Sequence, residues 1–285
     1  MKLNSSQLEA FFSVAKILNF TQASRGLNIT QSALSQRIAK LEDDLGVALF
    51  IRDRSSIRLT EYGEKLLRYC QLHESSESEL LANLKESSKD LAGVIRVGGF
   101  SSVNRSLVIP SFRKIMEKNP RLSIQLITKE MTELEPLLRT SEADYIFTTL
   151  KSNSPDFESI LLGYEENVLV QSKKSSDTGI FLDHDEKDLT TKNYFSQSGL
   201  SFKPSNMRYL DDVYGLLDGV KNGYGKAVLP LHLIKDEKCI EIINPKHVLK
   251  VPVFLQYYVQ PYYRRSHEQI LSQVTEHFKK HLRQN

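Results

Sequence analysis

The stretch from residue 21 to residue 60 constrains this chain most, because it combines two short helical segments, a tight turn and a hairpin. Its centre is an apolar stripe with the period of an α-helix, formed by Leu34, Ile38, Leu41 and Leu45. At about 100° per residue, these side chains fall on one narrow face. The opposite side carries mainly short or uncharged side chains: Ser32, Ser35, Gln36, Ala39 and Lys40.

That polar face indicates a helix that meets another surface. Small side chains permit a close approach, and Ser and Gln can both donate and accept hydrogen bonds at base edges in the major groove of DNA. For this segment alone, an ordinary amphipathic surface helix is the alternative. The neighbouring residues favour the first interpretation, because Thr21 is placed to cap a short helix through Leu27 and Thr30 to cap the next helix. This order of elements is typical of a helix-turn-helix.

After Gly46 the apolar pattern changes to short runs that favour strands. Residues 49–52 and 57–59 can pair as a hairpin across residues 53–56. Arg52, Arg54 and Arg58 cluster on this hairpin, where they can reach phosphates or a minor groove. A solvated edge strand is the alternative for three arginines on a hairpin. Directly after a helix-turn-helix, a DNA-contacting wing is the better interpretation.

The segment ITQSALSQRIAKLEDDLGVALFIRD, with LT shortly after it, closely resembles the N-terminal domain of LysR-type transcriptional regulators. The resemblance implies base contacts from Gln31, Ser32, Ser35 and Gln36, and backbone contacts from Arg37, Arg52 and Arg54. Lys40 and Arg58 join these candidates by their charge and position. Many members have Ser-Arg-Gln where this chain has Ser35-Gln36-Arg37, so the contact made by the arginine is open.

Length and charge set broader limits. A chain of 285 residues can hold two domains, each with its own core. Its net charge of +3 does not by itself indicate a polyanionic partner. The positive charge is local, because the first 41 residues contain five basic side chains and only Glu9 as an acid. Cys70 and Cys239 have no metal-ligand spacing and fit a reducing cytosol. Because no apolar signal or membrane span is visible, we expect a cytoplasmic protein without membrane contact.

Residues 61–90 are expected to form a long linker helix, since only Gly63 interrupts a helix-friendly sequence without proline. A partial apolar seam runs along it: Tyr62, Leu66, Tyr69, His73, Leu80 and Leu84. The resemblance implies that this helix pairs with its twin in a homodimer, and that two dimers form a homotetramer. Two recognition helices would then read the half-sites of a palindromic operator. An unpaired linker helix is the alternative.

From Gly93 onward, strands and helices alternate, which predicts an α/β fold with ligands at the carboxyl ends of the strands. The segments resemble the family's two-subdomain effector domain, of the type II periplasmic-binding-protein kind. We therefore expect a winged helix-turn-helix in residues 1–60, a linker in 61–90 and an effector-binding domain in 91–285. The resemblance places subdomain I in 91–162 and 262–285, and subdomain II in 163–261.

The best candidate for effector binding is the turn from residue 98 to residue 102, because it follows a strand and opens a helix. Its hydroxyl and backbone N–H groups can hold a carboxylate, while a tight turn capped by Ser102 is the alternative. In the family this position touches effector. The predicted effector-binding residues are Gly99, Ser101, Ser102, Thr148, Thr149, Gln197, Ser198 and Tyr224.

The acidic run from residue 183 to residue 188 is open to two interpretations. It is either a solvated loop or a site for the cationic group of a ligand, whereas metal binding lacks a second ligand cluster. The run, with residues 31–42, looks like the branch of the family that senses lysine or arginine and controls amino-acid export. A bound amino acid would then place its carboxylate at Ser101 and Ser102 and its side chain near these acids.

The sequence offers only weak candidates for a catalytic or metal-binding site. His277 and His281 have a spacing that could bind a metal on a helix, but Phe278 and Leu282 make an ordinary helix the better interpretation. The chain has no Walker-type loop and no nucleophile elbow, so we expect no enzyme, no cofactor and no metal. The expected partners are double-stranded DNA, a small-molecule effector and the chain itself, with RNA polymerase as a further candidate. The alternative function is an architectural DNA-binding protein with a degenerate sensor.

Overall fold

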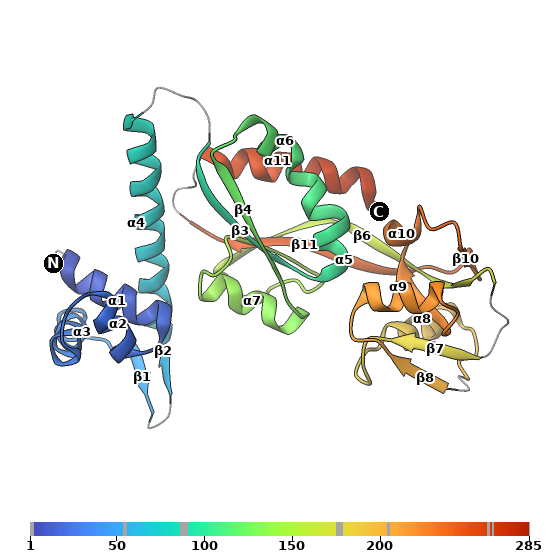
Figure 1. The fold of residues 1–285 in the computed structure, drawn as a ribbon, viewed down its shortest axis with the longest axis horizontal. Helices are drawn as coiled ribbons and strands as arrows, with labels where there is room; N and C mark the ends of the chain where they lie inside the picture. The colour runs from blue at the N-terminus through green and yellow to red at the C-terminus, as the bar shows by residue number, and fades with distance from the viewer. Residues whose placement is uncertain are drawn as a thin grey trace. The chain divides into compact units, whose positions relative to one another are not determined.

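The structure is a computed structural model that describes residues 3–53, 56–85, 91–174, 179–203, 206–260, 263 and 265–284 (Figure 1). The chain divides into two compact units. The first contains Met1–Lys89 and Pro136–Glu142, and the second contains Asp90–Glu135 and Ala143–Asn285. In the described part of the chain, no helix combines the length and the apolar character that crossing a membrane requires.

The core of the first unit is built by α1 (Ser5–Ile17), α2 (Phe20–Gly26) and α3 (Gln31–Leu45). The predicted apolar stripe of α3 is confirmed, because Leu34, Ile38 and Leu41 are fully buried. These side chains share one cluster with Phe11 and Val14 of α1. Burying an aliphatic or aromatic side chain stabilises a fold by about 1.5–3 kcal/mol, so the stripe fixes which side of α3 faces outward.

The caps of the helices differ in one place from the prediction. The N–H of Gln22 donates to the side-chain oxygen of Asn19 at 2.9 Å, so Asn19 caps α2. The prediction that Thr21 caps this helix is wrong, because α2 begins one residue before it. The predicted cap of α3 is confirmed: the N–H of Ala33 donates to Thr30 Oγ1 at 3.2 Å.

The predicted wing is present as β1 (Phe50–Arg52) and β2 (Ile57–Leu59), which pair antiparallel with Phe50 opposite Leu59. It leads into α4 (Glu61–Lys85). The first turn of α4 passes close to the entry of β1, and a Cβ atom at position 63 would lie 2.2 Å from the carbonyl oxygen of Leu49. The helix continues through position 63, and a glycine stands there because no side chain fits beside Leu49.

One face of α4 packs on the helical core through Leu67 and Cys70. Burial raises the pKa of the Cys70 thiol to about 11, so this cysteine is held as an unreactive thiol. On the predicted seam, Tyr62 and Tyr69 are exposed. The side chains of Leu80 and Leu84 lie outside the described residues.

A mixed sheet runs through the second unit. Its strands lie in the order β4 (Leu122–Thr128), β3 (Gly93–Gly99), β5 (Tyr145–Thr148), β11 (Leu249–Tyr258), β6 (Phe157–Ser172), β9 (Lys226–Pro230), β7 (Ile180–Asp183) and β8 (Asn206–Tyr209), with β10 (Ile240–Ile242) paired to β6. The helices are α5 (Ser101–Val103), the π-helical turn η1 (Asn104–Val108), α6 (Ile109–Lys118), α7 (Met131–Arg139), α8 (Thr190–Ser198), α9 (Val213–Lys221), α10 (Leu231–Ile234) and α11 (Arg265–His281).

The long strands β6 and β11 cross together between the two subdomains (Figure 1). Gly163, with φ of +143°, lies opposite Val253, and the register shifts between Val253 and Phe254. From Phe254 onward β11 pairs with β5 of subdomain I. The strand β11 thus passes from one subdomain to the other near Val253, opposite Gly163. The predicted return point, Pro261, lies outside the described residues, and the predicted subdomain bounds stay predictions.

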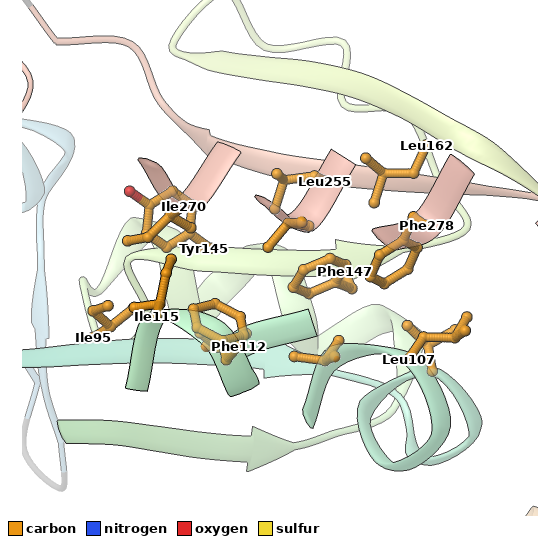
Figure 2. Packing of buried hydrophobic residues seen from close by; sticks show 14 of the residues in the cluster. Ile95, Leu107, Phe112, Ile115, Tyr145, Phe147, Leu162, Leu255, Ile270 and Phe278 are labelled. Carbon is orange, nitrogen blue, oxygen red and sulfur yellow. The ribbon is translucent and has the colours of Figure 1, made fainter. Parts of the chain in front are cut away.

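Aromatic stacking holds α11 on the sheet of subdomain I (Figure 2). The rings of Phe147 on β5 and Phe278 on α11 are stacked with their centroids 5.1 Å apart. Phe112 and Ile115 of α6 are buried in the same cluster. The second half of the chain thus returns to complete the core that the first strands begin.

Gly63 provides a stability test with a built-in control. We expect Gly63→Ala to lower the free energy of unfolding by about 1–3 kcal/mol, because the added methyl group meets backbone at Leu49. Gly26→Ala is the control, since a Cβ there meets nothing within 4 Å and alanine favours a helix. Calorimetry of the full chain measures both. Equal transitions for Gly63→Ala and the wild type would contradict the close approach.

Candidate DNA-binding surface and effector cleft

The outward face of α3 is polar and close to the protein surface. Gln31, Ser32, Gln36 and Lys40 are exposed, and Ser35 and Arg37 are half-buried beside them. The opposite face is in the core, so this helix can turn only its polar side to another molecule. Gln36 and Ser35 can hydrogen-bond base edges, while Arg37 and Lys40 supply positive charge. The structure brings these predicted DNA-binding residues onto one surface.

The start of α3 is fixed by its neighbours. Thr30 Oγ1 lies 3.1 Å from Ser32 Oγ, and Thr21 Oγ1 donates to Gln31 Oε1 at 3.4 Å. The second contact joins α2 to the first residue of α3. These hydroxyl groups orient Gln31 and Ser32 before any ligand is bound.

Glu42, which the sequence analysis did not select, holds the wing against α3. Its Oε1 accepts the N–H groups of Leu49 at 2.7 Å and Phe50 at 3.2 Å. Its Oε2 lies 3.6 Å from the guanidinium of Arg52, which also lies over the ring of Phe20 at 4.6 Å. Hydrogen bonds to a charged acceptor are about twice as strong as neutral ones. This carboxylate therefore sets the position of the wing and of its first arginine.

Of the other two arginines of the wing, Arg58 and Arg54, only Arg58 is among the described residues. Arg58 pairs with Asp53 at 3.1 Å, and both side chains are more than half exposed. Exposed pairs of this kind contribute about 0–1 kcal/mol, so Arg58 can exchange Asp53 for a phosphate at small cost. Arg54 lies outside the described residues.

In subdomain I, parallel strands bring several predicted effector residues to one edge. Gly99 at the end of β3 lies opposite Thr128 of β4 and Phe147 of β5. Ser101 and Ser102 follow β3, Thr148 is the last residue of β5, and Thr149 follows it. Gly99 itself has a packing role, because a Cβ there would lie 2.3 Å from Asn104 Oδ1.

The Ser102 hydroxyl is already engaged by the chain. Ser102 is buried, and its Oγ donates to Glu165 Oε1 at 3.2 Å. Glu165 belongs to β6, is 4% exposed, and lies 2.7 Å from His232 Nε2. His232 Nδ1 in turn lies 2.8 Å from Ser106 Oγ. Two serines of subdomain I thus meet a carboxylate and an imidazole of subdomain II.

The imidazole of His232 links the two subdomains through both of its nitrogens. Nε2 contacts the Glu165 carboxylate, and Nδ1 contacts the Ser106 hydroxyl. The Ser106 hydroxyl also donates to the Ser102 carbonyl at 2.5 Å, which ties this contact to the helix that carries both serines.

Ser106, His232 and Glu165 have the connectivity of a catalytic triad, but not its chemistry. A nucleophilic serine gives its proton to an unprotonated histidine nitrogen. Here the Ser106 hydroxyl donates to the Ser102 carbonyl, so its proton is engaged by the backbone. The cluster joins the two subdomains through hydrogen bonds.

Arg105, about one helical turn after Ser102, makes a second contact between the subdomains. The guanidinium of Arg105 lies 4.2 Å from the ring centroid of Tyr214, in the first turn of α9. Burial raises the pKa of the Tyr214 hydroxyl, Arg105 opposes this rise and Asp212 adds to it. Asp211 and Asp212 are exposed at this edge, and the N–H of Asp211 donates to the carbonyl of His184 at 2.9 Å. The basic Arg105 of subdomain I and the acidic Asp212 of subdomain II therefore both lie near the Tyr214 ring.

The residues predicted in subdomain II lie at a different edge of the sheet from the acidic run. β7, β8 and β9 are parallel, so their carboxyl ends lie at one edge of the sheet. Gln197 and Ser198 end α8, which leads to the start of β8, and Tyr224 precedes the start of β9. These residues lie at the opposite edge, away from the ends of β7 and β8 that carry Asp183 and Tyr209. The structure does not bring them together with Ser101.

The acidic run lies at the cleft edge, but most of its carboxylates serve their own loop. Asp185 Oδ1 accepts the N–H groups of Lys187 and Asp188, and Asp188 accepts those of His184 and Thr190. Burial raises the pKa of Asp183 to about 6, although the hydroxyl of Thr191 donates to it. The role of this run as a cation-binding group stays a prediction, and the neighbouring Asp211 and Asp212 are exposed.

Thr148 and Thr149 are held by neighbours at the cleft edge. Thr148 Oγ1 accepts the N–H of Leu150 at 3.2 Å, and Thr149 Oγ1 lies 3.6 Å from Met131 Sδ. Gln256 of β11 is buried and donates to the Leu150 carbonyl at 2.7 Å. Among the described residues, no three His, Cys, Asp or Glu side chains form a group that could hold a metal ion.

Two family profiles match the chain. The profile described as "Bacterial regulatory helix-turn-helix protein, lysR family" matches residues 5–64. The profile described as "LysR substrate binding domain" matches residues 88–285. The first lies within the first unit, and the second includes all of the second unit.

Individual relatives agree with these profiles. The HTH-type transcriptional activator IlvY of Haemophilus influenzae is 32% identical over 155 residues, which are 53% of this chain and 51% of that protein. The HTH-type transcriptional regulator ShiR of Corynebacterium glutamicum is 30% identical over 167 residues, covering 58% and 57%. The matched segments thus span about half the length of these curated relatives.

Solved structures share the whole fold. The crystal structure of ArgP from Mycobacterium tuberculosis has a TM-score of 0.80 at 19% identity and covers 100% of both chains. Full-length LysG from Corynebacterium glutamicum, with the bound effector Arg, has a TM-score of 0.78 at 18% identity and covers 99% of this chain and 100% of that one. With both of its parts matched by the family's profiles, the chain belongs to the LysR family of bacterial helix-turn-helix transcriptional regulators, which are not enzymes.

Proposed function

We propose that this protein reads an operator sequence in double-stranded DNA through α3 and regulates transcription from the cytoplasm. The exposed polar face of α3, fixed by a buried apolar stripe, is the observation that carries this proposal. Gln36 and Ser35 read base edges, and Arg37, Lys40, Arg52 and Arg58 neutralise phosphates. The exposed Tyr62 and Tyr69 of α4 contact the same helix of a second copy and so form a dimer. Two such dimers form a tetramer. The tetramer contacts RNA polymerase.

The effector in this proposal is a small molecule in the cleft of the second unit, with a basic amino acid as the first candidate. The hydroxyls of Ser101 and Thr149 and the guanidinium of Arg105 can hold its carboxylate. Asp211 and Asp212, exposed at the facing edge, can pair with its side-chain cation. LysG, which has a similar fold, was solved with Arg as its effector, and this makes arginine the first compound to test.

A second candidate function is favoured by one observation. The Ser102 hydroxyl, expected to receive an effector carboxylate, is occupied by Glu165 of the same chain. A sensor whose site is filled by its own carboxylate fits an architectural DNA-binding protein with a degenerate effector domain. A ligand-induced rise in melting temperature with any small molecule that acts through the cleft separates the two functions.

The DNA interface makes a direct prediction. Ser35→Ala and Gln36→Ala should each weaken operator binding by about 1–3 kcal/mol and leave binding to random DNA nearly unchanged, because base contacts carry specificity. Arg52→Ala should weaken both and reduce the salt dependence. Gln125→Ala, exposed on β4, is the control. Fluorescence anisotropy with genomic operator fragments measures these affinities, and equal losses on both DNAs for Ser35→Ala would contradict base reading.

The effector site makes a second prediction, for isothermal titration with arginine and lysine. We expect Asp212→Asn to weaken binding about tenfold, since it removes the charge facing the ligand cation. Glu186→Gln should change the affinity less than about twofold, because Glu186 is an exposed carboxylate of the acidic run that no contact joins to the cleft in the described residues. If neither amino acid produces heat with the wild type, the proposed effector class fails while the DNA-binding proposal stands.

A further inference from the structure

A cavity of about 980 Å³ opens between α10, β10 and the end of α11. Both subdomains line it: Ser106, Leu107 and Arg283 come from subdomain I, and His232 and Ile240 come from subdomain II. No residue that the sequence analysis selected for effector binding lies in its wall. The cavity is therefore distinct from the cleft at the ends of β3 and β5.

The wall combines an apolar floor with a cationic rim. The apolar side chains are Leu107, Leu231, Ile234, Ile240, Ile242 and Leu282. The charged side chains are Lys173, Lys235, Lys238, Lys280, Arg283, Glu166, Asp236 and Glu237. Glu237 is neutralised by Lys221 at 2.6 Å, and Lys280 is paired with Glu276. Positive charge remains in excess over Glu166 and Asp236.

Much of this positive charge is available to a ligand. Within the described residues, Lys235, Lys238 and Arg283 form no ion pair. Lys173 donates to the Lys238 carbonyl at 2.8 Å, so its charge is not balanced by a carboxylate there. Lys235, Lys238 and Arg283 are exposed at the rim, so an anion can reach them without displacing an acidic partner.

His232 connects the cavity to the contact between the subdomains. Its imidazole lines the cavity, and the same ring bonds Glu165 at 2.7 Å and Ser106 at 2.8 Å. An anion in the cavity would lie close to the His232 ring. It would also touch both subdomains at the place where they meet.

We propose that this cavity is a second small-molecule site, which binds an organic anion with an apolar body. The apolar floor accepts the body, and Lys235, Lys238 and Arg283 accept the anionic group. A carboxylate or a phosphate monoester on an aromatic or branched aliphatic group has this chemistry. The site adds to the cleft effector and does not depend on the identity of that effector.

The chain has no tryptophan, so a single introduced tryptophan reports on the cavity alone. Leu231 lines the cavity and is 36% exposed, and Leu231→Trp is the reporter. The probe is phenyl phosphate, with inorganic phosphate and benzyl alcohol as partial probes. We expect saturable quenching by phenyl phosphate at a concentration at least about tenfold below that needed with either partial probe, because each lacks one of the two interactions.

Charge reversals locate the probe. In the reporter background, Lys235→Glu with Lys238→Glu should weaken phenyl phosphate binding about tenfold or more. Lys192→Glu with Lys246→Glu is the matched control, since both lysines are exposed in the same subdomain, outside the cavity wall, and the net charge changes equally. The control should weaken binding less than about twofold.

Three results would overturn the proposal: no saturable quenching, equal weakening by both charge pairs, or loss of the signal on Thr149→Asp in the cleft. If Leu231→Trp melts below the wild type, the same comparison is made without it. The readout is then the rise in melting temperature that phenyl phosphate gives the wild type and the two charge variants. The proposal is also overturned if phenyl phosphate does not raise the melting temperature of the wild type. It is overturned as well if the rise is equal in the two charge variants.

Discussion

Glu165 places a carboxylate inside the second unit, where removing a charge from water costs several kcal/mol unless partners replace the water. The chain supplies these partners from two directions. His232 of the same subdomain pairs with it at 2.7 Å, and Ser102 of the other subdomain donates to it at 3.2 Å. The strand that carries Glu165 also carries the crossing at Gly163, so this buried carboxylate lies two residues from the point at which the subdomains separate. Its hydrogen bonds therefore join the two subdomains beside the crossing.

The first unit uses the same physical device for a different purpose. Glu42 accepts two backbone N–H groups at the entry of the wing and attracts Arg52 at 3.6 Å. Leaving those donors unpaired would cost about 1–3 kcal/mol each, so the carboxylate ties the recognition helix to the wing. The position of a predicted phosphate contact, Arg52, is thus set by an acidic residue that never has to touch DNA.

The sequence predicted well wherever a long pattern carried the information. The apolar stripe of α3 and the alternation from β3 to β5 were sufficient to place α3 and the edge with Ser101 and Thr149. The strands β7 and β8 were not predicted. Without them the direction of the sheet in subdomain II was unknown, and the selected residues Gln197, Ser198 and Tyr224 lie at the edge opposite to Asp183 and Tyr209. Glu165 and His232 are 67 residues apart, and no local pattern joins them.

The placement of these partners determines what opening the cleft would cost. Glu165 and His232 belong to the same subdomain, so their hydrogen bond does not cross between the subdomains. In this cluster only the contacts with Ser102 and Ser106 cross, and each typical hydrogen bond contributes about 0.5–1.5 kcal/mol net. The contact of Arg105 with Tyr214 crosses as well. The buried Glu165 carboxylate would keep His232 as a partner if these contacts were lost. Open and closed arrangements would then differ by only a few kcal/mol in these contacts, a difference that a ligand with modest preference for one arrangement can reverse. A partner of Glu165 on the other subdomain would have resisted such a ligand.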